Sequence, residues 1–191
     1  FLLMTLLLPL QSFACTAFFV EGSASSVVAK NLDWYSPNGR IYINKRSVRK
    51  KAILVDSNNS LKWKSKYASL TITGSGREFP WEGFNEAGLS VNSLQLNSTI
   101  VSLPDDTLPS VGSVQWIQYI LDSSANIREA IENARKVRIS YPSDLHYFLC
   151  EDTSKCAAVE SIDGNLIVTE GEKLPNKALS NETYQNSLRM S

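Results

Sequence analysis

The sequence predicts an α+β fold in which helices pack on a mainly antiparallel sheet. Runs with the alternation typical of strands occupy the chain up to residue 96 and again after residue 144. Between these regions the spacing of the apolar residues changes to that of helices. Strands, then helices, then strands is an order typical of α+β domains rather than of repeated βαβ units. The 191 residues contain no internal repeat or linker-like stretch, so we expect one domain.

The strands are predicted from β-branched and aromatic runs that turn residues separate. The first two runs flank a Glu-Gly-Ser turn, which indicates a hairpin. The predicted strands are 16–20, 26–29, 40–44, 52–55, 67–73, 88–96, 145–150, 156–160 and 165–169.

Two helices are predicted after Pro109, where apolar residues recur at intervals of three and four. Asn126 is followed three residues later by Glu129, the pattern of a capping box at the start of the second helix. We interpret both apolar stripes as faces turned to the core. They consist of Val114, Ile117, Ile120 and Leu121, and of Ile127, Ala130, Ile131 and Ala134.

The charge composition argues against a nucleic-acid-binding protein. Nineteen Lys and Arg balance nineteen Asp and Glu, and the only basic cluster is the short one at residues 45–51. Binding to nucleic acid requires a concentrated excess of basic residues that neutralises phosphates. The chain has a single His, so a metal centre is not expected either.

Residues 1–14 predict a signal peptide. The segment is apolar and uncharged, contains Pro9, and ends with the small residues Ser12 and Ala14 on either side of Phe13. It is too short to cross a bilayer, which requires about 20 apolar residues. We therefore expect a periplasmic or secreted protein without stable membrane insertion. The alternative is a buried first strand or helix.

Cleavage after Ala14 would make Cys15 the N-terminal residue of the mature chain. Cys15 would then carry a thiol and a free α-amine, whose ordinary pKa is about 7.7 to 8. One residue would supply both a nucleophile and a base. Two other interpretations stay open. In the first, Cys15 is the lipid-linked residue of a lipoprotein, although Ser12 stands where such signals usually have Leu. In the second, Cys15 is an inert, half-buried thiol.

The other two cysteines, Cys150 and Cys156, flank a turn-rich centre between two strand-like runs. They would face each other across a hairpin, where they form a disulfide if the geometry allows it and stay reduced otherwise.

Four motifs in order resemble the choloylglycine hydrolase and penicillin V acylase family of N-terminal nucleophile hydrolases. They are CTAFFV from Cys15, AKNLDW at 29–34, EGFNEAGLSVNSLQL at 82–96 and ALSN at 178–181. The resemblance implies a four-layer αββα sandwich with antiparallel sheets, and hydrolysis of linear amide bonds other than peptide bonds, without a cofactor. Because family members are longer, it also implies that the domain at 15–191 is truncated at its C-terminal end.

The resemblance assigns roles to five residues. Cys15 would be the nucleophile and base, and Asp33 would hold its α-amine or a substrate amide. Asn181 would donate to the oxyanion, together with a backbone N–H near Gln95, which stands where relatives have Asn or Tyr. Lys30 takes the place of the family's usual Arg. Either cation can stabilise a thiolate, but Lys lacks the planar fork of Arg.

Three aromatic residues, Trp34, Phe79 and Trp81, are expected to line an apolar acyl pocket, with core packing as the alternative. Export favours penicillin V or N-acyl homoserine lactones as substrates over conjugated bile acids. The alternatives are a bile-salt hydrolase, an acid-ceramidase-like amidase and a non-enzymatic lipoprotein anchored through Cys15. The resemblance also implies a homo-oligomer.

Overall fold

The computed structural model describes residues 15–33, 38–55, 58–101, 107–140 and 144–190. The predicted signal peptide and Trp34 lie outside these ranges, so both stay predictions. Among the described residues, no helix is long and apolar enough to cross a membrane.

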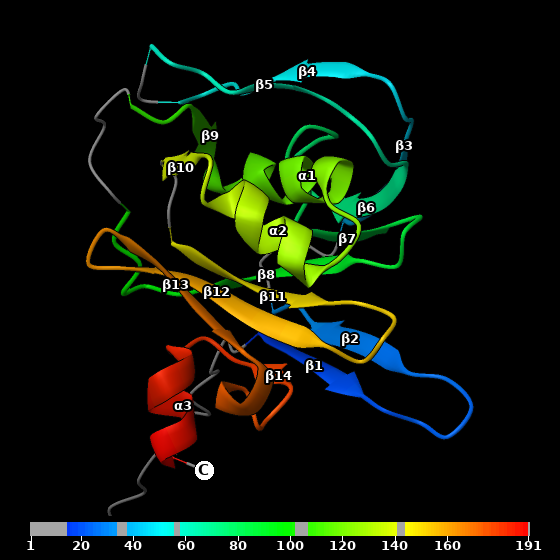
Figure 1. The fold of residues 1–191 in the computed structure, drawn as a ribbon, viewed down its shortest axis with the longest axis vertical. Helices are drawn as coiled ribbons and strands as arrows, with labels where there is room; N and C mark the ends of the chain where they lie inside the picture. Colours follow the sequence, from blue (N-terminus) through cyan, green and yellow to red (C-terminus); the bar gives the residue numbers. More distant parts are fainter. Residues whose placement is uncertain (1–14, 34–37, 56–57, 102–106, 141–143, 191) are drawn as a thin grey trace, which may run out of the picture.

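A seven-stranded sheet forms the centre of the molecule (Figure 1). Its neighbouring strands are all antiparallel. Positive φ angles at Asp163 and Gly164 make the tight turn that joins its last two strands, as an Asp-Gly hairpin requires. In spatial order the strands are β13 (Asn165–Glu170), β12 (Cys156–Ile162), β11 (Leu145–Cys150), β8 (Ser90–Gln95), β7 (Glu82–Asn85), β6 (Ser69–Thr73) and β3 (Arg40–Asn44).

A smaller, three-stranded antiparallel sheet packs on one face of the large sheet (Figure 1). Its order is β14 (Ala178–Leu179), β1 (Thr16–Val20) and β2 (Val27–Asn31). The helices α1 (Ser113–Ser123) and α2 (Ile127–Ala134) cover the opposite face of the large sheet. This succession of helices, sheet and sheet confirms the α+β prediction.

The remaining elements are short. The helix α3 (Tyr184–Met190) follows β14 and lies on the same side as the small sheet (Figure 1). Two further strand pairs flank the helical side, and one turn of 3-10 helix lies on the side of the small sheet (Figure 1). These are β4 (Arg49–Lys51) with β5 (Lys62–Lys64), β9 (Ser110–Gly112) with β10 (Arg138–Ser140), and η1 (Gly171–Lys173).

Alternation along the strands gives the large sheet two buried faces. On β8, Val91 belongs to a cluster with the helices, which we call the helix-side core, whereas Leu94 belongs to a cluster with the small sheet, which we call the inter-sheet layer. In the helix-side core the rings of Trp116 and Tyr147 lie 4.2 Å apart. Buried members of the inter-sheet layer include Cys15, Ala17, Phe19, Phe148, Ala158, Leu179 and Tyr184.

The predicted strand at 52–55 is wrong. The strand in this part of the chain is β4, which ends at Lys51 and pairs with β5. Leu54 has a φ of 55°, which extended backbone does not allow, and the N–H of Ile53 donates to Gln115 on α1. The other eight predicted strands are confirmed to within two residues at each end.

The capping box of α2 is confirmed in its first half. The Asn126 side chain accepts the N–H of Glu129 at 2.9 Å. The Glu129 carboxylate reaches one residue further back than the pattern predicts, to the N–H of Ala125. Side chains therefore still accept hydrogen bonds from two backbone N–H groups at the start of α2, those of Glu129 and Ala125.

Cys150 and Cys156 form a disulfide. They lie directly opposite each other on β11 and β12, and both are buried in the inter-sheet layer. Cys15 is the free cysteine of the described chain.

Candidate active site

Cys15 lies just before β1, the central strand of the small sheet. It shares the inter-sheet layer with Ala17, and only 6% of its surface is exposed. Its Sγ is 4.0 Å from the carbonyl oxygen of Asp33, a contact typical of a weakly donating thiol. The pairing of β1 with β2 therefore brings the two predicted residues Cys15 and Asp33 together.

Cys15 opens into a cavity of about 260 Å³ between the ends of β1, β8 and β11 and the start of α1. This cavity is close to the lower end of the range of about 300–1,000 Å³ that is usual for small-molecule sites. A buried thiol beside an apolar wall is an arrangement suited to an acyl group. The apolar lining consists of Leu32, Trp81, Leu94, Val114 and Leu145, and the polar lining of Ser75, Ser93, Gln95, Ser113 and Asp144.

Asn181 is joined to this cavity through Gln95. Its side-chain Nδ2 donates a hydrogen bond to the Gln95 carbonyl oxygen at 2.7 Å. A side-chain amide has two N–H donors, and this bond uses one of them. The Gln95 side chain turns away and donates to Asn97 at 2.9 Å. The backbone carbonyl of Gln95 thus bonds Asn181, and the oxyanion contact predicted for a backbone N–H near Gln95 stays a prediction.

Asp33 follows β2 and is half-buried. Its carboxylate accepts a hydrogen bond from the Asn31 side chain at 3.3 Å. The carboxylate thus lies on the segment whose backbone contacts Cys15, although the cavity lining includes neither Asp33 nor Lys30.

Lys30 makes a contact that the sequence did not predict. Its Nζ is 2.8 Å from a carboxylate oxygen of Glu82, and its side chain is 3% exposed. Neither atom makes a hydrogen bond of good geometry, so the contact is an ion pair that rests on charge. Lys30 belongs to the small sheet and Glu82 to the large one, so the pair bridges the two sheets.

Of the three predicted aromatic residues, Trp81 lines the Cys15 cavity. Phe79 lines a neighbouring cavity of about 340 Å³, which shares Ser75 and Val114 with the first. Trp81 is held in place because Ser93 donates to its carbonyl oxygen at 2.6 Å. Gly74 lies against the indole ring, where a Cβ atom would come within 2.2 Å of it.

Ser113 is a cavity residue that sequence reasoning missed. Its hydroxyl is buried and has no hydrogen-bond partner among the described residues. The Tyr147 hydroxyl donates to its carbonyl oxygen at 2.8 Å, and burial raises the pKa of Tyr147, so this phenol stays a donor. No local pattern marks Ser113, because it reaches the cavity only through the packing of α1 on the sheet.

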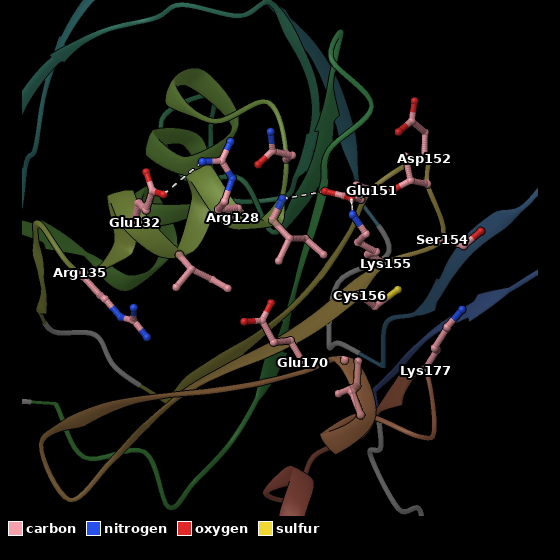
Figure 2. Close-up of a pocket in the computed structure, with 16 residues that line it drawn as sticks. Arg128, Glu132, Arg135, Glu151, Asp152, Ser154, Lys155, Cys156, Glu170 and Lys177 are labelled. Atoms are coloured by element: carbon pink, nitrogen blue, oxygen red, sulfur yellow. Dashed lines mark hydrogen bonds and ion pairs between the residues drawn. The ribbon is translucent and has the colours of Figure 1, made fainter.

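A larger cavity of about 890 Å³ lies elsewhere, between the start of α2, the β11–β12 turn and η1 (Figure 2). Charged side chains of both signs surround it, among them Arg135, Glu170 and Lys177. Its one cysteine, Cys156, is oxidised in the disulfide. We therefore assign the candidate chemistry to the smaller cavity, which contains the free thiol. Across the described ranges, no group of three His, Cys, Asp or Glu gathers as a metal site would require.

Comparison with known proteins agrees with this geometry. Residues 15–179 match the family described as linear amide C-N hydrolases, choloylglycine hydrolase family. A penicillin V acylase from Pectobacterium atrosepticum is 24% identical over 177 residues, which are 82% of this chain and 46% of that protein.

Two solved structures resemble the fold. Penicillin V acylase from Agrobacterium tumefaciens superposes with a TM-score of 0.80 at 26% identity, over 92% of this chain and 55% of that one. Conjugated bile acid hydrolase from Clostridium perfringens gives 0.74 at 21% identity, over 92% and 56%, and supports the fold alone. The likeness confirms the predicted αββα class, and the chain spans about half the length of these relatives. The chain belongs to the choloylglycine hydrolase family of linear amide C-N hydrolases.

Proposed function

We propose that this protein is an exported amidohydrolase that removes an acyl group from a linear amide, with Cys15 as its nucleophile. One observation carries the proposal. The buried Cys15 thiol borders a largely apolar cavity, and another residue of that cavity, Gln95, is bonded to the Asn181 amide. A nucleophile, an acyl-sized space and an amide donor are the parts that acyl transfer through a thioester requires.

The reaction begins when the Cys15 thiolate attacks the amide carbonyl and forms a carbon–sulfur bond. The second N–H of Asn181 and a backbone N–H near Gln95 donate to the oxyanion. The carbon–nitrogen bond then breaks, and the leaving amine takes the proton that the α-amine had received from the thiol. Water attacks the thioester, the carbon–sulfur bond breaks, the carboxylic acid leaves, and the thiol regains its proton.

The base in this scheme is the α-amine of Cys15, so residues 1–14 must be removed first. The family match supports this point because it begins at residue 15. Removal by a signal peptidase would make the enzyme periplasmic or secreted. The backbone carbonyl of Asp33 contacts the Cys15 thiol. The Asp33 carboxylate is therefore the acceptor proposed for the α-amine of Cys15 when that amine is protonated.

The cavity supports a small acyl group. A volume of about 260 Å³ fits a single aromatic ring or a short acyl chain better than the four fused rings of a bile acid. The proposed substrates are therefore penicillin V or N-acyl homoserine lactones. Ser113, whose buried hydroxyl lacks a partner among the described residues, is available to bind a polar atom of the acyl group.

The test is an assay of the exported protein with penicillin V, an N-acyl homoserine lactone and a glycine-conjugated bile acid. We expect hydrolysis of one of the first two, and a loss of about 10⁴- to 10⁶-fold in Cys15→Ala, because a nucleophile cannot be replaced. The matched control is Cys150→Ala/Cys156→Ala, which removes the sulfur atoms of the other two cysteines and should keep the wild-type rate at a temperature where the variant stays folded. A Cys15→Ala variant as active as the wild type would refute the proposal.

A further inference from the structure

A second buried ionisable pair lies in the inter-sheet layer, and neither of its residues lines any of the three cavities described above. His146, the only histidine of the chain, is fully buried on β11, and Glu160 on β12 is 2% exposed. The Nδ1 of His146 lies 3.1 Å from a carboxylate oxygen of Glu160. Burial of a carboxylate is costly unless hydrogen bonds satisfy it, so the Glu160 carboxylate requires further hydrogen-bond donors.

The same carboxylate accepts a hydrogen bond from the polypeptide backbone. The N–H of Tyr184, the first residue of α3, is 3.1 Å from the oxygen that faces His146. The Tyr184 hydroxyl donates to the carbonyl oxygen of Asn176 at 2.9 Å and accepts the Asn176 N–H at 3.2 Å. Tyr184 therefore closes the segment 176–184 into a loop, and Glu160 ties that loop to the large sheet.

Asn181 lies within this loop, between two fixed points. On one side, Leu179 of β14 pairs with Ala17, two residues from Cys15. On the other side, the Tyr184 N–H is bonded to Glu160. Between them, the only side-chain bond of Asn181 among the described residues is the one to Gln95. The position of the Asn181 amide thus depends on both anchors.

His146 also connects this pair to the cavity. Its strand β11 pairs with β8, so that Leu145 lies opposite Gln95 and His146 opposite Leu94. Three of these four residues line the Cys15 cavity. The loop carries one further acidic group near His146, Glu182, whose pKa is lowered mainly by the Thr183 N–H and the Asn186 side chain and to a smaller extent by His146.

We propose that His146 and Glu160 form a positioning pair that holds the loop 176–184 so that Asn181 reaches the oxyanion. This inference rests on the proposed function of Asn181. His146 fixes the Glu160 carboxylate, the carboxylate fixes the Tyr184 N–H, and Tyr184 fixes the loop. Neither residue touches the substrate, so their effect falls on the rate of acylation and not on substrate binding. A displacement of a reacting group by about 1 Å can cost about 10² in rate.

The test compares two replacements of Glu160 that have similar volumes. Glu160→Gln keeps an oxygen that accepts the Tyr184 N–H, whereas Glu160→Met has none. We expect Glu160→Met to lower kcat about 10- to 100-fold with KM changed less than about threefold, and Glu160→Gln to restore kcat to within about threefold of the wild type. Hydrogen exchange of the Tyr184 amide should accelerate in the Met variant only. Glu170→Gln, an exposed carboxylate on the next strand, is the control and should leave kcat unchanged.

The outcomes separate this inference from the proposed function. A wild type that hydrolyses its substrate through Cys15, together with a folded Glu160→Met variant of normal kcat, would overturn the positioning role alone. A wild type inactive on every acyl amide would overturn both. If Glu160→Met does not fold, Tyr184→Phe decides, because it removes only the hydroxyl that closes the loop on Asn176. A fall in kcat with KM unchanged supports the inference, and an unchanged kcat contradicts it.

Discussion

The two faces of the large sheet differ in the groups that they bury. The helix-side core is dominated by apolar and aromatic side chains, and Asp122, one of the charged groups buried on this side, accepts hydrogen bonds from Trp63 and Gln118 and pairs with Lys50. The inter-sheet layer contains the free thiol of Cys15. The strands on either side of it carry the ion pair Lys30–Glu82 and the pair His146–Glu160.

This difference indicates a division of labour between the two faces. Apolar burial against helices contributes stability without reactive groups. Ionisable groups between two sheets cost desolvation energy, and here they connect to the segments that carry Cys15, Gln95 and Asn181. We therefore expect substitutions on the helix side to change stability, and substitutions in the inter-sheet layer to change activity.

The largest expected effect on stability is on the helix side. Trp116 is fully buried and packs on Tyr147, so Trp116→Ala should lower the free energy of unfolding by about 3–5 kcal/mol. Urea unfolding measures this loss. The kcat per folded molecule should stay within about twofold of the wild type, because Trp116 does not line the Cys15 cavity. A large fall in kcat of the folded variant would contradict the expectation that substitutions on the helix side change stability and not activity.

Asn181→Ala should have the opposite profile. Loss of an oxyanion donor typically lowers kcat by about 10²- to 10³-fold. The free energy of unfolding should fall by only about 1 kcal/mol, since one hydrogen bond, to Gln95, is removed. Steady-state kinetics and urea unfolding of the same preparation test both halves, and normal kinetics would remove Asn181 from the mechanism.

The Lys30–Glu82 pair is expected to have an intermediate effect. Lys30→Met leaves the Glu82 carboxylate, 18% exposed, without its cation and should cost about 1–3 kcal/mol of stability. The double variant Lys30→Met/Glu82→Met removes both charges and should recover most of this loss. The cycle of four unfolding free energies measures the coupling. Additive losses would mean that the two side chains do not interact across the sheets.

The smallest effect concerns pH and lies on the helix side. Burial acts to raise the pKa of Glu151, but hydrogen bonds from Thr153 and from the N–H of Ile127, with Lys155 nearby, hold it below its ordinary value of 4.5. Because the folded-state pKa is lowered, the carboxylate stabilises the fold fully above 4.5, and this contribution is lost as pH falls through the folded-state pKa. Glu151→Gln should therefore be less stable than the wild type at pH 7, by less than about 1 kcal/mol.

Unfolding of both proteins at pH 7 and at pH 3 checks this prediction. The difference in stability should shrink at the lower pH, because pH 3 is below the ordinary pKa of 4.5 that the carboxyl group has in the unfolded chain. A difference that is equal at both values would show that the charge of Glu151 contributes nothing.

The sequence predicted the elements whose signal is local. Strands with clear alternation, such as β3 and β11, and both apolar helical stripes are found at the expected residues. The short strands β4, β5, β7, β9, β10 and β14 were missed because two to four residues are too few to show an alternation, and pairing with a partner strand defines them. The helix α3 was missed because its only buried residue is Tyr184.

Motifs account for part of the candidate site, and the roles that they assign stay predictions. Cys15, Asp33, Gln95 and Asn181 follow from the family resemblance, and contacts in the structure link them. Ser113, Glu82, His146 and Glu160 were missed, since their roles depend on how the two sheets and α1 stack. Phe79 was predicted for the acyl pocket but lines the neighbouring cavity, a displacement that depends on the path of the loop before β7.

The central claim is that Cys15 acts with a free α-amine, and the intact mass of the exported protein from its full-length reading frame tests it most directly. We expect a mass that corresponds to a chain beginning at unmodified Cys15. A chain that retains Ala14, or a lipid on Cys15, would leave no free α-amine. Either result would contradict the mechanism and favour an anchored or inactive protein.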